Sequence, residues 1–438
     1  MNPVTAQTLP ESTLLLGLMA VLLCPLAVAG LALINAGLGR SRNAAHSALS
    51  SFGIFCAAAG AYFICGFAWQ GIAGGAFHGI QVSGKNWNLI GAGHFFLKDL
   101  RFDTPGPAIV ALFQMMCAGL AAMIPVGGGA ERWRLSGSTI SAALLAGWTY
   151  PLFAHWVWAS GWLAQLGGNY GFGSGFLDAA GSGVVQTVGG LTALSISWVL
   201  KPRRGKYSHD GIPAAIPGHD IILVLLGGCL TLTGWLGLNT AGSLLFAGAP
   251  AAAIATVAIN TILCAAFAGL AAAFFTRVRF GKPDASLCVN GCIGGLAASS
   301  AACCWVTPLA AAVIGAIAGT LVTYSVELFE LHLKVDDPGG AISVHAVCGI
   351  WGLLSVALLG KFPTGTGGAG QWTAQLVGIA TLVGFVLPLS YSLHWLVNRF
   401  LPQRVVSEAE RHGLDLHELG TGAYPEFVTH TDEYHVRG

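Results

Sequence analysis

The sequence predicts an all-α polytopic membrane protein with eleven transmembrane helices. Of its 438 residues, 54% are hydrophobic and only 9% are charged, whereas soluble domains carry about 25% charged residues. Apolar runs close to the roughly 20 residues that a membrane-spanning helix needs recur along nearly the whole chain. Basic residues gather in alternate connecting segments, as they do in membrane proteins of fixed orientation.

The apolar runs are expected to be helices, because lipid leaves backbone groups without a hydrogen-bond partner outside a helix or a closed barrel. The short alternating segments that are typical of a barrel are absent from the sequence. The predicted spans lie near residues 12–37, 45–70, 107–129, 136–160, 178–200, 218–238, 250–275, 285–306, 308–330, 342–360 and 371–399.

The distribution of lysine and arginine predicts the orientation of the chain. One set of alternate connections, together with the C-terminal tail, holds most of the 20 basic residues, and the other set holds only Lys85, Lys98, Arg101 and Lys361. Because these residues concentrate on the cytoplasmic side, the N-terminus is predicted outside and the C-terminus inside. We therefore expect a multi-pass cell-membrane protein, with a transmembrane domain at 1–400 and a polar cytoplasmic tail at 401–438, for which the family resemblance given below implies a regulatory role.

One short pattern occurs twice, in Asp178–Gly190 and in Asp337–Gly349. The two copies share an aspartate, two glycines and two valines at the same spacing. In the predicted topology the copies run in opposite directions across the membrane. This predicts two inverted five-helix repeats, near 12–200 and 218–360, and a final long helix at 371–399.

A large polar side chain follows each of these aspartates by eight residues within an apolar run: Gln186 in the first copy and His345 in the second. Eight residues of helix advance about 12 Å, so both side chains are expected near the middle of a bilayer core about 30 Å thick. Polar groups at that depth usually face a cavity or a partner. The pair is predicted to line a pore; the alternative is two satisfied polar groups between packed helices.

Composition argues against several other classes of function. A net charge of +1 gives no reason to expect a nucleic-acid partner. The 11 cysteines lie mostly in apolar runs without the paired spacing of a zinc site, so neither a metal nor a cofactor is predicted. The sequence has no nucleophile–base spacing and no phosphate-binding loop, and the protein is predicted not to be an enzyme.

Aromatic and polar residues near the ends of three spans indicate an outer opening. Phe113 on the third span and Trp158 on the fourth predict a site where aromatic faces attract an ammonium-like cation. The alternative is that these rings anchor the protein at the membrane interface. The run Trp235–Ser243 closes the predicted sixth span, and its Asn, Thr and Ser side chains favour a helix cap over acceptors for an entering ion.

These motifs occur in a fixed order along nearly the whole chain. They are Ala130–Arg132, His155–Trp158, Asp178–Gln186, Trp235–Ser243, Val335–Pro338, Ser343–Gly349 and, in the tail, Gly413–Leu416 with Gly420 and Ala423–Tyr424. No single motif is specific, but together they resemble the ammonium transporter (Amt/Mep/Rh) family. The resemblance implies a homotrimer in the lipid bilayer with one pore per subunit, which takes ammonium or ammonia as its substrate.

The resemblance also implies roles for individual residues. Trp158 would stack on the recruited cation beside Phe113 and Ser243, and Asp178 would support this site from beneath. A PII-type signalling protein would dock on the tail; alternatively, the tail packs as a regulatory arm against the inner face of its own subunit. The gate and pore would be formed by Cys117, Gln186, Trp235, Leu238 and His345.

Three departures from the family pattern concern the conduction path. Gln186 stands where the first of two pore histidines is expected, and Cys117 and Leu238 stand where phenylalanines are expected. One extra residue also precedes Ser243. Glutamine does not titrate near neutral pH as histidine does, so a proton relay between two rings would lose one member. Without the two phenylalanines, a dry constriction that gates the pore would also be lost.

Three functions fit this sequence. The first is transport of ammonium or ammonia, with proton coupling altered by Gln186. The second is an ammonium-binding sensor with little or no flux, because the substitutions lie along the conduction path while the fold motifs are kept. The third is a channel for another small neutral solute. Saturable uptake supports transport, whereas binding without flux supports the sensor.

Overall fold

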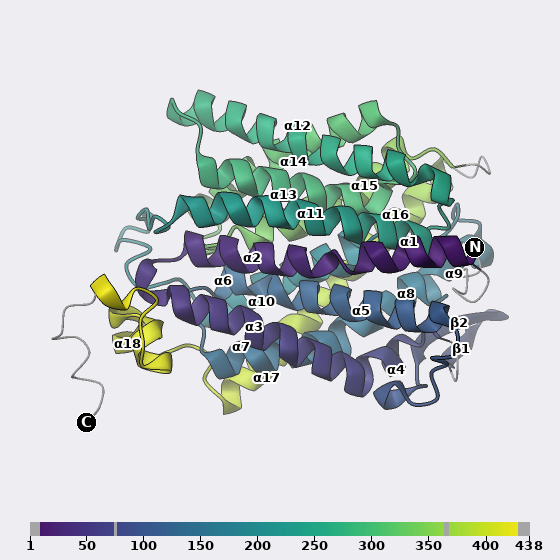
Figure 1. Cartoon of the computed structure of the whole chain (residues 1–438), viewed down its shortest axis with the longest axis horizontal. Coiled ribbons are helices and arrows are strands. Elements are labelled where there is room, and N and C mark those ends of the chain that lie inside the picture. The colour runs from purple at the N-terminus through teal and green to yellow at the C-terminus, as the bar shows by residue number, and fades with distance from the viewer. Residues whose placement is uncertain (1–8, 74–76, 363–367, 428–438) are drawn as a thin grey trace.

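Long helices packed side by side make up the body of the protein (Figure 1). The structure, a computed structural model, describes residues 9–73, 77–362 and 368–427. Within these residues, ten helical segments are long and apolar enough to cross a membrane, which confirms the predicted all-helical class. They are Glu11–Leu38, Ser41–Gln70, Pro105–Gly129, Ser182–Leu200, Ile221–Leu245, Ala251–Phe280, Ala285–Ala302, Pro308–His332, Ile342–Leu359 and Ala369–Phe400.

Five of these ten segments combine α-helices with short π-helical turns. The α-helices are α1 (Glu11–Val21), α2 (Cys24–Leu38), α3 (Ala44–Ala61), α4 (Phe67–Gln70), α5 (Pro105–Met123), α6 (Pro125–Gly129), α7 (Leu135–Leu144), α8 (Tyr150–Trp158), α9 (Trp162–Tyr170), α10 (Val188–Leu200), α11 (Ile221–Leu245), α12 (Ile254–Phe280), α13 (Ala285–Ala302), α14 (Pro308–Glu327), α15 (Cys348–Leu359), α16 (Ala369–Thr381), α17 (Leu387–Phe400) and α18 (Ser407–His412). The π-helical turns are Tyr62–Gly66, Leu145–Thr149, Ser182–Thr187, Leu328–His332, Ile342–Val347, Leu382–Val386 and Asp415–Leu419.

Proline explains two of the π-helical turns. Leu145–Thr149 comes just before Pro151, and Leu382–Val386 comes just before Pro388. Proline has no backbone N–H, and its ring clashes with the carbonyl four residues earlier. The turn before each proline therefore widens, and the helix continues without a break in its course.

The predicted span 136–160 is helical throughout, as α7, the π-helical turn Leu145–Thr149 and α8. It runs from one end of the bundle to the other (Figure 1). It is not among the ten segments above, because serine, threonine and glycine in its first turns, and then Gly147–Pro151 and His155, make the segment less apolar than the others. A total of eleven spans therefore stays a prediction.

Several predicted helix bounds are wrong: α12 continues past residue 275 to Phe280, and α13 ends at Ala302 rather than near 306. Two further errors concern the site. The span predicted to begin at Asp178 begins at Ser182, because Gly181 takes a left-handed backbone conformation (φ 105°) that keeps the aspartate outside the helix. The span predicted to end near residue 238 continues to Leu245. The polar run before Ser243 therefore lies inside α11 and does not cap it. Asn239 there donates hydrogen bonds of 2.9 Å to hydroxyls on α12 and α13.

The connection between the second and third predicted spans contains a β-hairpin that was not expected from the sequence. Strand β1 (Phe77–Val82) pairs antiparallel with β2 (Lys85–Gly91). The intervening Ser83 and Gly84 both have positive φ, 52° and 72°, as the two-residue hairpin turns that match strand twist require. The ring of Trp87 packs 5.4 Å from that of Tyr170 at the end of α9, which fixes the hairpin on the bundle.

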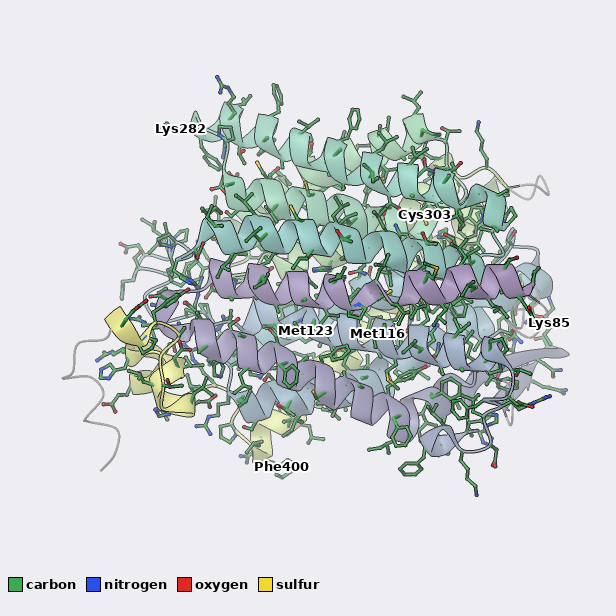
Figure 2. The ribbon with its side chains drawn as sticks, in the orientation of Figure 1. Lys85, Met116, Met123, Lys282, Cys303 and Phe400 are labelled. Carbon is green, nitrogen blue, oxygen red and sulfur yellow. The ribbon has the colours of Figure 1, made fainter. Side chains whose placement is uncertain are left out.

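The two ends of the bundle differ. The hairpin, α9 and the beginning of α1 lie at one end, called here the hairpin end, and α18 lies at the opposite or tail end (Figure 1). Lys85 marks the hairpin end and Lys282 the tail end (Figure 2).

Glycine allows the helices to approach closely, as is common in membrane bundles. On α14, a Cβ atom at Gly315 or Gly319 would collide with backbone atoms of Cys264 or Ala268 on α12. Contacts of this kind link α12, α13 and α14, and α11 packs similarly along α2. The helices that follow the repeated aspartates, Ser182–Leu200 and Ile342–Leu359, lie against each other, and we call them the two central helices.

Candidate functional site

The two copies of the repeated pattern form matching helix beginnings. Asp178 accepts hydrogen bonds of 2.8–2.9 Å from four successive backbone N–H groups, those of residues 181–184. Asp337 accepts two, from Ala341 (3.0 Å) and Ile342 (2.7 Å). The first N–H groups of a helix have no hydrogen-bond acceptor within the helix. At each of the two sites, one aspartate carboxylate is that acceptor. Gly181 and Gly340 both have positive φ, 105° and 70°, which turns the chain back onto the aspartate.

The same two helices cross at the glycines that close the pattern. A Cβ atom at Gly190 would collide with the backbone nitrogen of Ala346, and one at Gly349 with the side chain of Thr187. Each glycine therefore lies against the π-helical turn of the other copy. The shared glycines of the pattern are explained by this reciprocal contact, which brings the two central helices together.

At this crossing the structure places Gln186 against His345, as the sequence predicted for two groups at one depth. Gln186 Oε1 lies 2.8 Å from His345 Nδ1, and both side chains are buried. A carbonyl oxygen only accepts, so Nδ1 carries the proton and Nε2 keeps a free lone pair. Gln186 Nε2 makes no hydrogen bond within the described residues. The pair thus offers one acceptor and one donor to a third group.

Trp235 completes this central group. Its ring lies nearly parallel to that of His345 (21°), with the ring centroids 6.4 Å apart. Its Nε1 donates a 2.9 Å hydrogen bond to the hydroxyl of Ser300 on α13. The indole is therefore held flat against the imidazole, which restricts how His345 can turn.

Toward the hairpin end, three aromatic rings contact one another. Trp158 and Phe246 are stacked with centroids 5.0 Å apart and an 18° angle between planes. Phe113 lies 5.5 Å from Phe246 and 6.4 Å from Trp158. Trp158 Nε1 donates a 2.7 Å hydrogen bond to the backbone oxygen of Asp178. We call Phe113, Trp158 and Phe246 the aromatic group.

The remaining predicted site residues are buried nearby. Ser243 lies three residues before Phe246 on α11, and its Oγ is 3.3 Å from Cys303 Sγ. Cys117 and Leu238 are buried in the core between helices, at 0% and 1% exposure. Neither side chain presents an aromatic face.

Sequence reasoning missed Phe246, Ser300 and Cys303. Phe246 lies three residues after the motif Trp235–Ser243. The available signal was an aromatic residue close to a motif that was expected at a helix end. Ser300 and Cys303 lie on α13 and at its end, in a run of small residues that resembles ordinary tight packing. Nothing in the sequence distinguishes them from their neighbours.

Cavities continue from the central group toward the tail end. A cavity of about 20 Å³ is lined by His345, Asn290 and mainly apolar residues, among them Ile34 and Val344. Such a volume holds about one water molecule. Asn290 also lines a second cavity of about 220 Å³. Four carboxylates line that larger space: Asp284, Glu330, Asp336 and Asp337.

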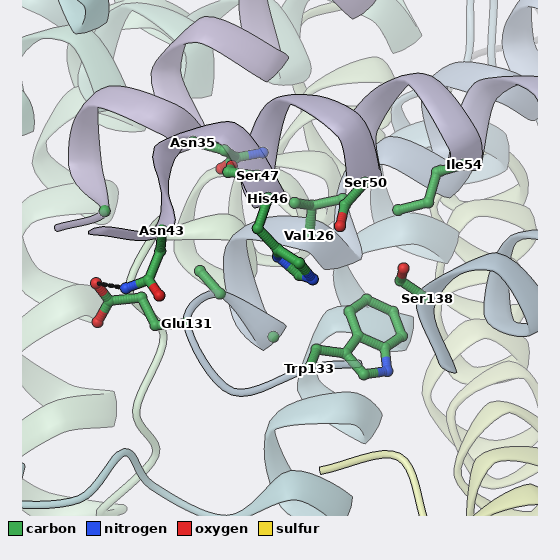
Figure 3. Close-up of a pocket in the computed structure, with 13 residues that line it drawn as sticks. Asn35, Asn43, His46, Ser47, Ser50, Ile54, Val126, Glu131, Trp133 and Ser138 are labelled. Atoms are coloured by element: carbon green, nitrogen blue, oxygen red, sulfur yellow. Dashed lines mark hydrogen bonds between the residues drawn. The ribbon is translucent and has the colours of Figure 1, made fainter. Parts of the chain in front are cut away.

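A buried ion-pair network closes the tail end beside these cavities. Arg203 donates to Glu131 (2.8 Å) and, through Nε and Nη2, to Asp336 (2.9 and 3.0 Å). Arg40 donates to Glu131 at 2.9 and 3.0 Å, and Asn43 adds a 3.0 Å bond (Figure 3). Glu131 also lines a cavity of about 20 Å³ with the rings of His46 and Trp133 (Figure 3).

The network predicts a pH dependence of stability. Burial alone would raise the pKa of Glu131, but hydrogen bonds and charge from Arg40 and Arg203 outweigh it and lower that pKa from 4.5 to about 2. A carboxylate whose pKa falls on folding stabilises the protein above its unfolded pKa, and the effect disappears as pH falls through the folded pKa. We expect Glu131 to contribute about 3 kcal/mol above pH 4.5, declining to none near pH 2.

Thermal unfolding of the detergent-solubilised protein tests this expectation. Between pH 4.5 and pH 2, the melting temperature of the wild type should fall more steeply than that of Glu131→Gln. Glu327→Gln is the control. Glu327 pairs with Arg279, whose side chain is largely exposed, and exposed ion pairs contribute little to the free energy of unfolding. Parallel curves for the wild type and Glu131→Gln would contradict the assignment.

The tail packs on this end of the bundle. Asp415 is buried and accepts hydrogen bonds from the N–H groups of Ala45 (3.1 Å) and His46 (2.7 Å), at the beginning of α3. Glu418 contacts His46 Nε2 at 2.7 Å. Arg404 donates to the backbone oxygen of Leu200 at 2.7 Å. The described part of the tail, up to Phe427, thus packs against the bundle through buried polar contacts.

Removing the Asp415 carboxylate should release this arm. Asp415→Ala leaves the first N–H groups of α3 without their partner, a change that costs about 1 kcal/mol or somewhat more at a helix N-terminus. We expect limited trypsin cleavage after the exposed Arg411 to become about tenfold faster. Glu408→Gln, at an exposed position of the same tail, should leave the rate unchanged, and an unchanged rate for Asp415→Ala would show that the carboxylate does not hold the arm.

The fold and the site together define a multi-pass membrane transport protein, with paired polar groups where two matching helices cross. The chain belongs to the ammonium transporter family: residues 14–424 match the model of the Ammonium Transporter Family. Ammonium transporter Amt2 of Archaeoglobus fulgidus is 35% identical, with 98% of this chain and 92% of that protein covered. Ammonium transporter 1 member 3 of Solanum lycopersicum is 32% identical, over 90% of this chain and 89% of that protein.

Solved structures show the same fold. One described as Sensor Amt Protein superposes with a TM-score of 0.83 at 29% identity, covering 95% of this chain and 100% of that one. Candida albicans Mep2 superposes with a TM-score of 0.80, covering 98% of this chain and 93% of that one. At 23% identity, this similarity shows a shared fold. These relatives and the helical segments make this chain a multi-pass cell-membrane protein.

Proposed function

We propose that this protein transports ammonium or ammonia through a pore in each subunit, with proton coupling altered by Gln186. The observation that carries the proposal is the hydrogen bond between Gln186 and His345 where the two central helices cross. The aromatic group lies on one side of this pair, and the cavities beside His345 lie on the other. The polar pair thus stands between a cation-attracting site and a cavity that carboxylates and basic side chains both line.

Phe113 and Trp158 of the aromatic group are proposed as the recruitment site. The faces of Trp158 and Phe113 attract a cation electrostatically, and Asp178 fixes Trp158 through its backbone oxygen. Ser243 is proposed to belong to the same site through its hydroxyl, although that hydroxyl contacts Cys303 in the structure. Beyond them, Cys117 and Leu238 are proposed to form a gate with less aromatic bulk than the family pattern.

At the centre, ammonia is proposed to pass by exchanging hydrogen bonds. Ammonia has three donors and one lone pair, and the pair offers it an acceptor at His345 Nε2 and a donor at Gln186 Nε2. A proton cannot pass from one side chain to the other, because a glutamine amide does not titrate near neutral pH. We therefore propose that the proton of ammonium does not follow the substrate along this pair.

The proposed topology is eleven spans in two inverted repeats plus a final helix, with the N-terminus outside. Two observations support it: the helix Leu135–Trp158 runs the length of the bundle, and α1 begins at the end opposite α18 (Figure 1). The tail end would then be cytoplasmic, as its basic residues indicate. Assembly as a homotrimer, and docking of a PII-type protein on the tail, are proposed from the family resemblance.

The test is an ammonium concentration jump on purified protein in liposomes. We expect saturable alkalinisation of the lumen with little net current, because uncharged ammonia crosses while the proton stays behind. Protein-free liposomes are the necessary control, since ammonia also crosses lipid. A large current would contradict the altered proton coupling, and the absence of any protein-dependent flux would contradict transport.

A second candidate function is an ammonium sensor with little flux. It is favoured by the replacement at Gln186 and by the likeness to a solved structure described as a sensor. In the same liposomes a sensor gives neither alkalinisation nor current. It still binds ammonium, which calorimetry or thermal stabilisation of the solubilised protein would detect.

A further inference from the structure

Phe246 covers the surface that a recruited cation would use. Its ring is stacked on Trp158 with centroids 5.0 Å apart and planes 18° from parallel. A cation binds an aromatic ring over its face, within about 6 Å of the centroid. Two rings stacked this closely leave no space for an ammonium ion between them. The face of Trp158 that meets Phe246 is therefore unavailable while the stack persists.

The position of Phe246 in the chain allows its ring to move. The residue follows the last residue of α11, with a backbone (φ −123°) that is no longer helical. Its side chain is partly exposed, unlike those of Phe113 and Trp158, which are buried. The next residues include Gly248, at a positive φ of 66°, and end the segment at the exposed Pro250. A rotation of the side chain toward solvent requires no rearrangement of the helix.

The two neighbouring contacts of Phe246 hold the closed position. The ring of Phe113 lies 5.5 Å away at 30°, so Phe246 is flanked by two aromatic partners. The backbone N–H of Phe246 donates to Gly242, whose Cα approaches the segment that follows Asp178. The backbone is thus anchored to the recruitment site while the ring is the part that can leave.

We propose that Phe246 controls the access of ammonium to Trp158, by occupying the indole face until the ion displaces it. The proposal rests on the function proposed above and adds a residue that sets the apparent affinity for the ion. The ring of Phe246 and the cation compete for the same face of Trp158. Part of the binding free energy of the ion is therefore used to separate the two rings. Removing the ring frees the surface.

The test is the concentration dependence of ammonium uptake in liposomes for Phe246→Ala. The KM should fall about 2- to 10-fold, the range set by the strength of an aromatic pair, with the maximal rate unchanged. Phe246→Tyr restores a stacking ring and should return the KM to the wild-type value. Phe246→Leu keeps apolar bulk at the helix end but has no aromatic face, so it should also lower the KM. This variant tests the proposal even if the alanine variant does not fold.

A matched control is Phe385→Ala. Phe385 packs 5.1 Å from the ring of Trp156, away from the aromatic group, so its loss should leave the KM unchanged. An unchanged or raised KM in both Phe246→Ala and Phe246→Leu, with uptake by the wild type intact, would overturn this proposal alone. Absence of uptake and of binding in the wild type would overturn the proposed function, and this proposal with it.

Discussion

Replacing Asp178 by alanine is expected to abolish ammonium uptake, lowering its rate by about 100-fold or more. The carboxylate accepts hydrogen bonds from four backbone N–H groups, and it is buried. Leaving buried donors unpaired costs about 1–3 kcal/mol each, so the beginning of the helix that carries Gln186 should rearrange. Trp158 should shift with this rearrangement, because its Nε1 donates to the backbone oxygen of residue 178, which alanine keeps but the altered turn would displace.

The variant Asp178→Asn tests the charge of the side chain, because asparagine has nearly the same shape as aspartate but is neutral. The amide has one acceptor oxygen, so two of the four N–H groups would face an NH₂ group, and an intermediate loss of uptake is expected. Asp220→Asn is the matched control, since Asp220 accepts from two N–H groups at the beginning of α11, at the tail end of the bundle. It should retain uptake within about twofold, an effect typical of an exposed helix cap. Wild-type uptake by a folded Asp178→Ala protein would refute the role of this carboxylate.

Replacing Gln186 by histidine is expected to switch on a current. In the wild type, Gln186 Oε1 accepts from His345 Nδ1, and in the proposed mechanism no proton passes between the two side chains, because an amide does not titrate near neutral pH. Histidine at 186 places two titratable rings within hydrogen-bond distance, and imidazole exchanges protons near neutral pH. An ammonium jump should then produce a current severalfold above that of the wild type, measured on a supported membrane.

Two further variants make this result interpretable. Gln186→Leu removes both the acceptor and the donor, and it should reduce alkalinisation as well as current. Gln375→His introduces the same imidazole at a buried position that bonds to the backbone of residues 177 and 353, outside the central pair, and it should add no current. If Gln186→His conducts no more charge than the wild type, the glutamine is not what limits proton transfer.

The arrangement of helices could be predicted largely because membrane helices leave a local signal. Each span needs about 20 apolar residues in sequence, so hydropathy locates α12 or α14 without any knowledge of their neighbours. The exceptions are informative. The hairpin β1–β2 was missed because its strands are held by Tyr170 and other residues far along the chain. The helix Leu135–Trp158 was predicted, although its first turns are too polar to identify it by composition alone.

The site was predicted in part, for a comparable reason. The repeated pattern placed Gln186 and His345 at equivalent positions, and the structure brings them into contact. The motif that ends in Ser243 was expected to cap a helix, but α11 continues through it because Asn239 finds partners on two neighbouring helices. Phe246 was missed since its ring partners are more than 80 residues away, as the numbering of Phe113 and Trp158 shows.

The sequence by itself determined the class of protein, the repeat and the identity of the polar pair. These follow from composition and spacing, because lipid forces the backbone into helices and excludes unpaired polar groups. Only the tertiary structure decided which atoms meet: that Asp178 serves four N–H groups, that Gln186 accepts from His345 and that Phe246 covers Trp158. Such contacts depend on how distant helices pack, and the close approach at Gly190 and Gly349 sets that packing.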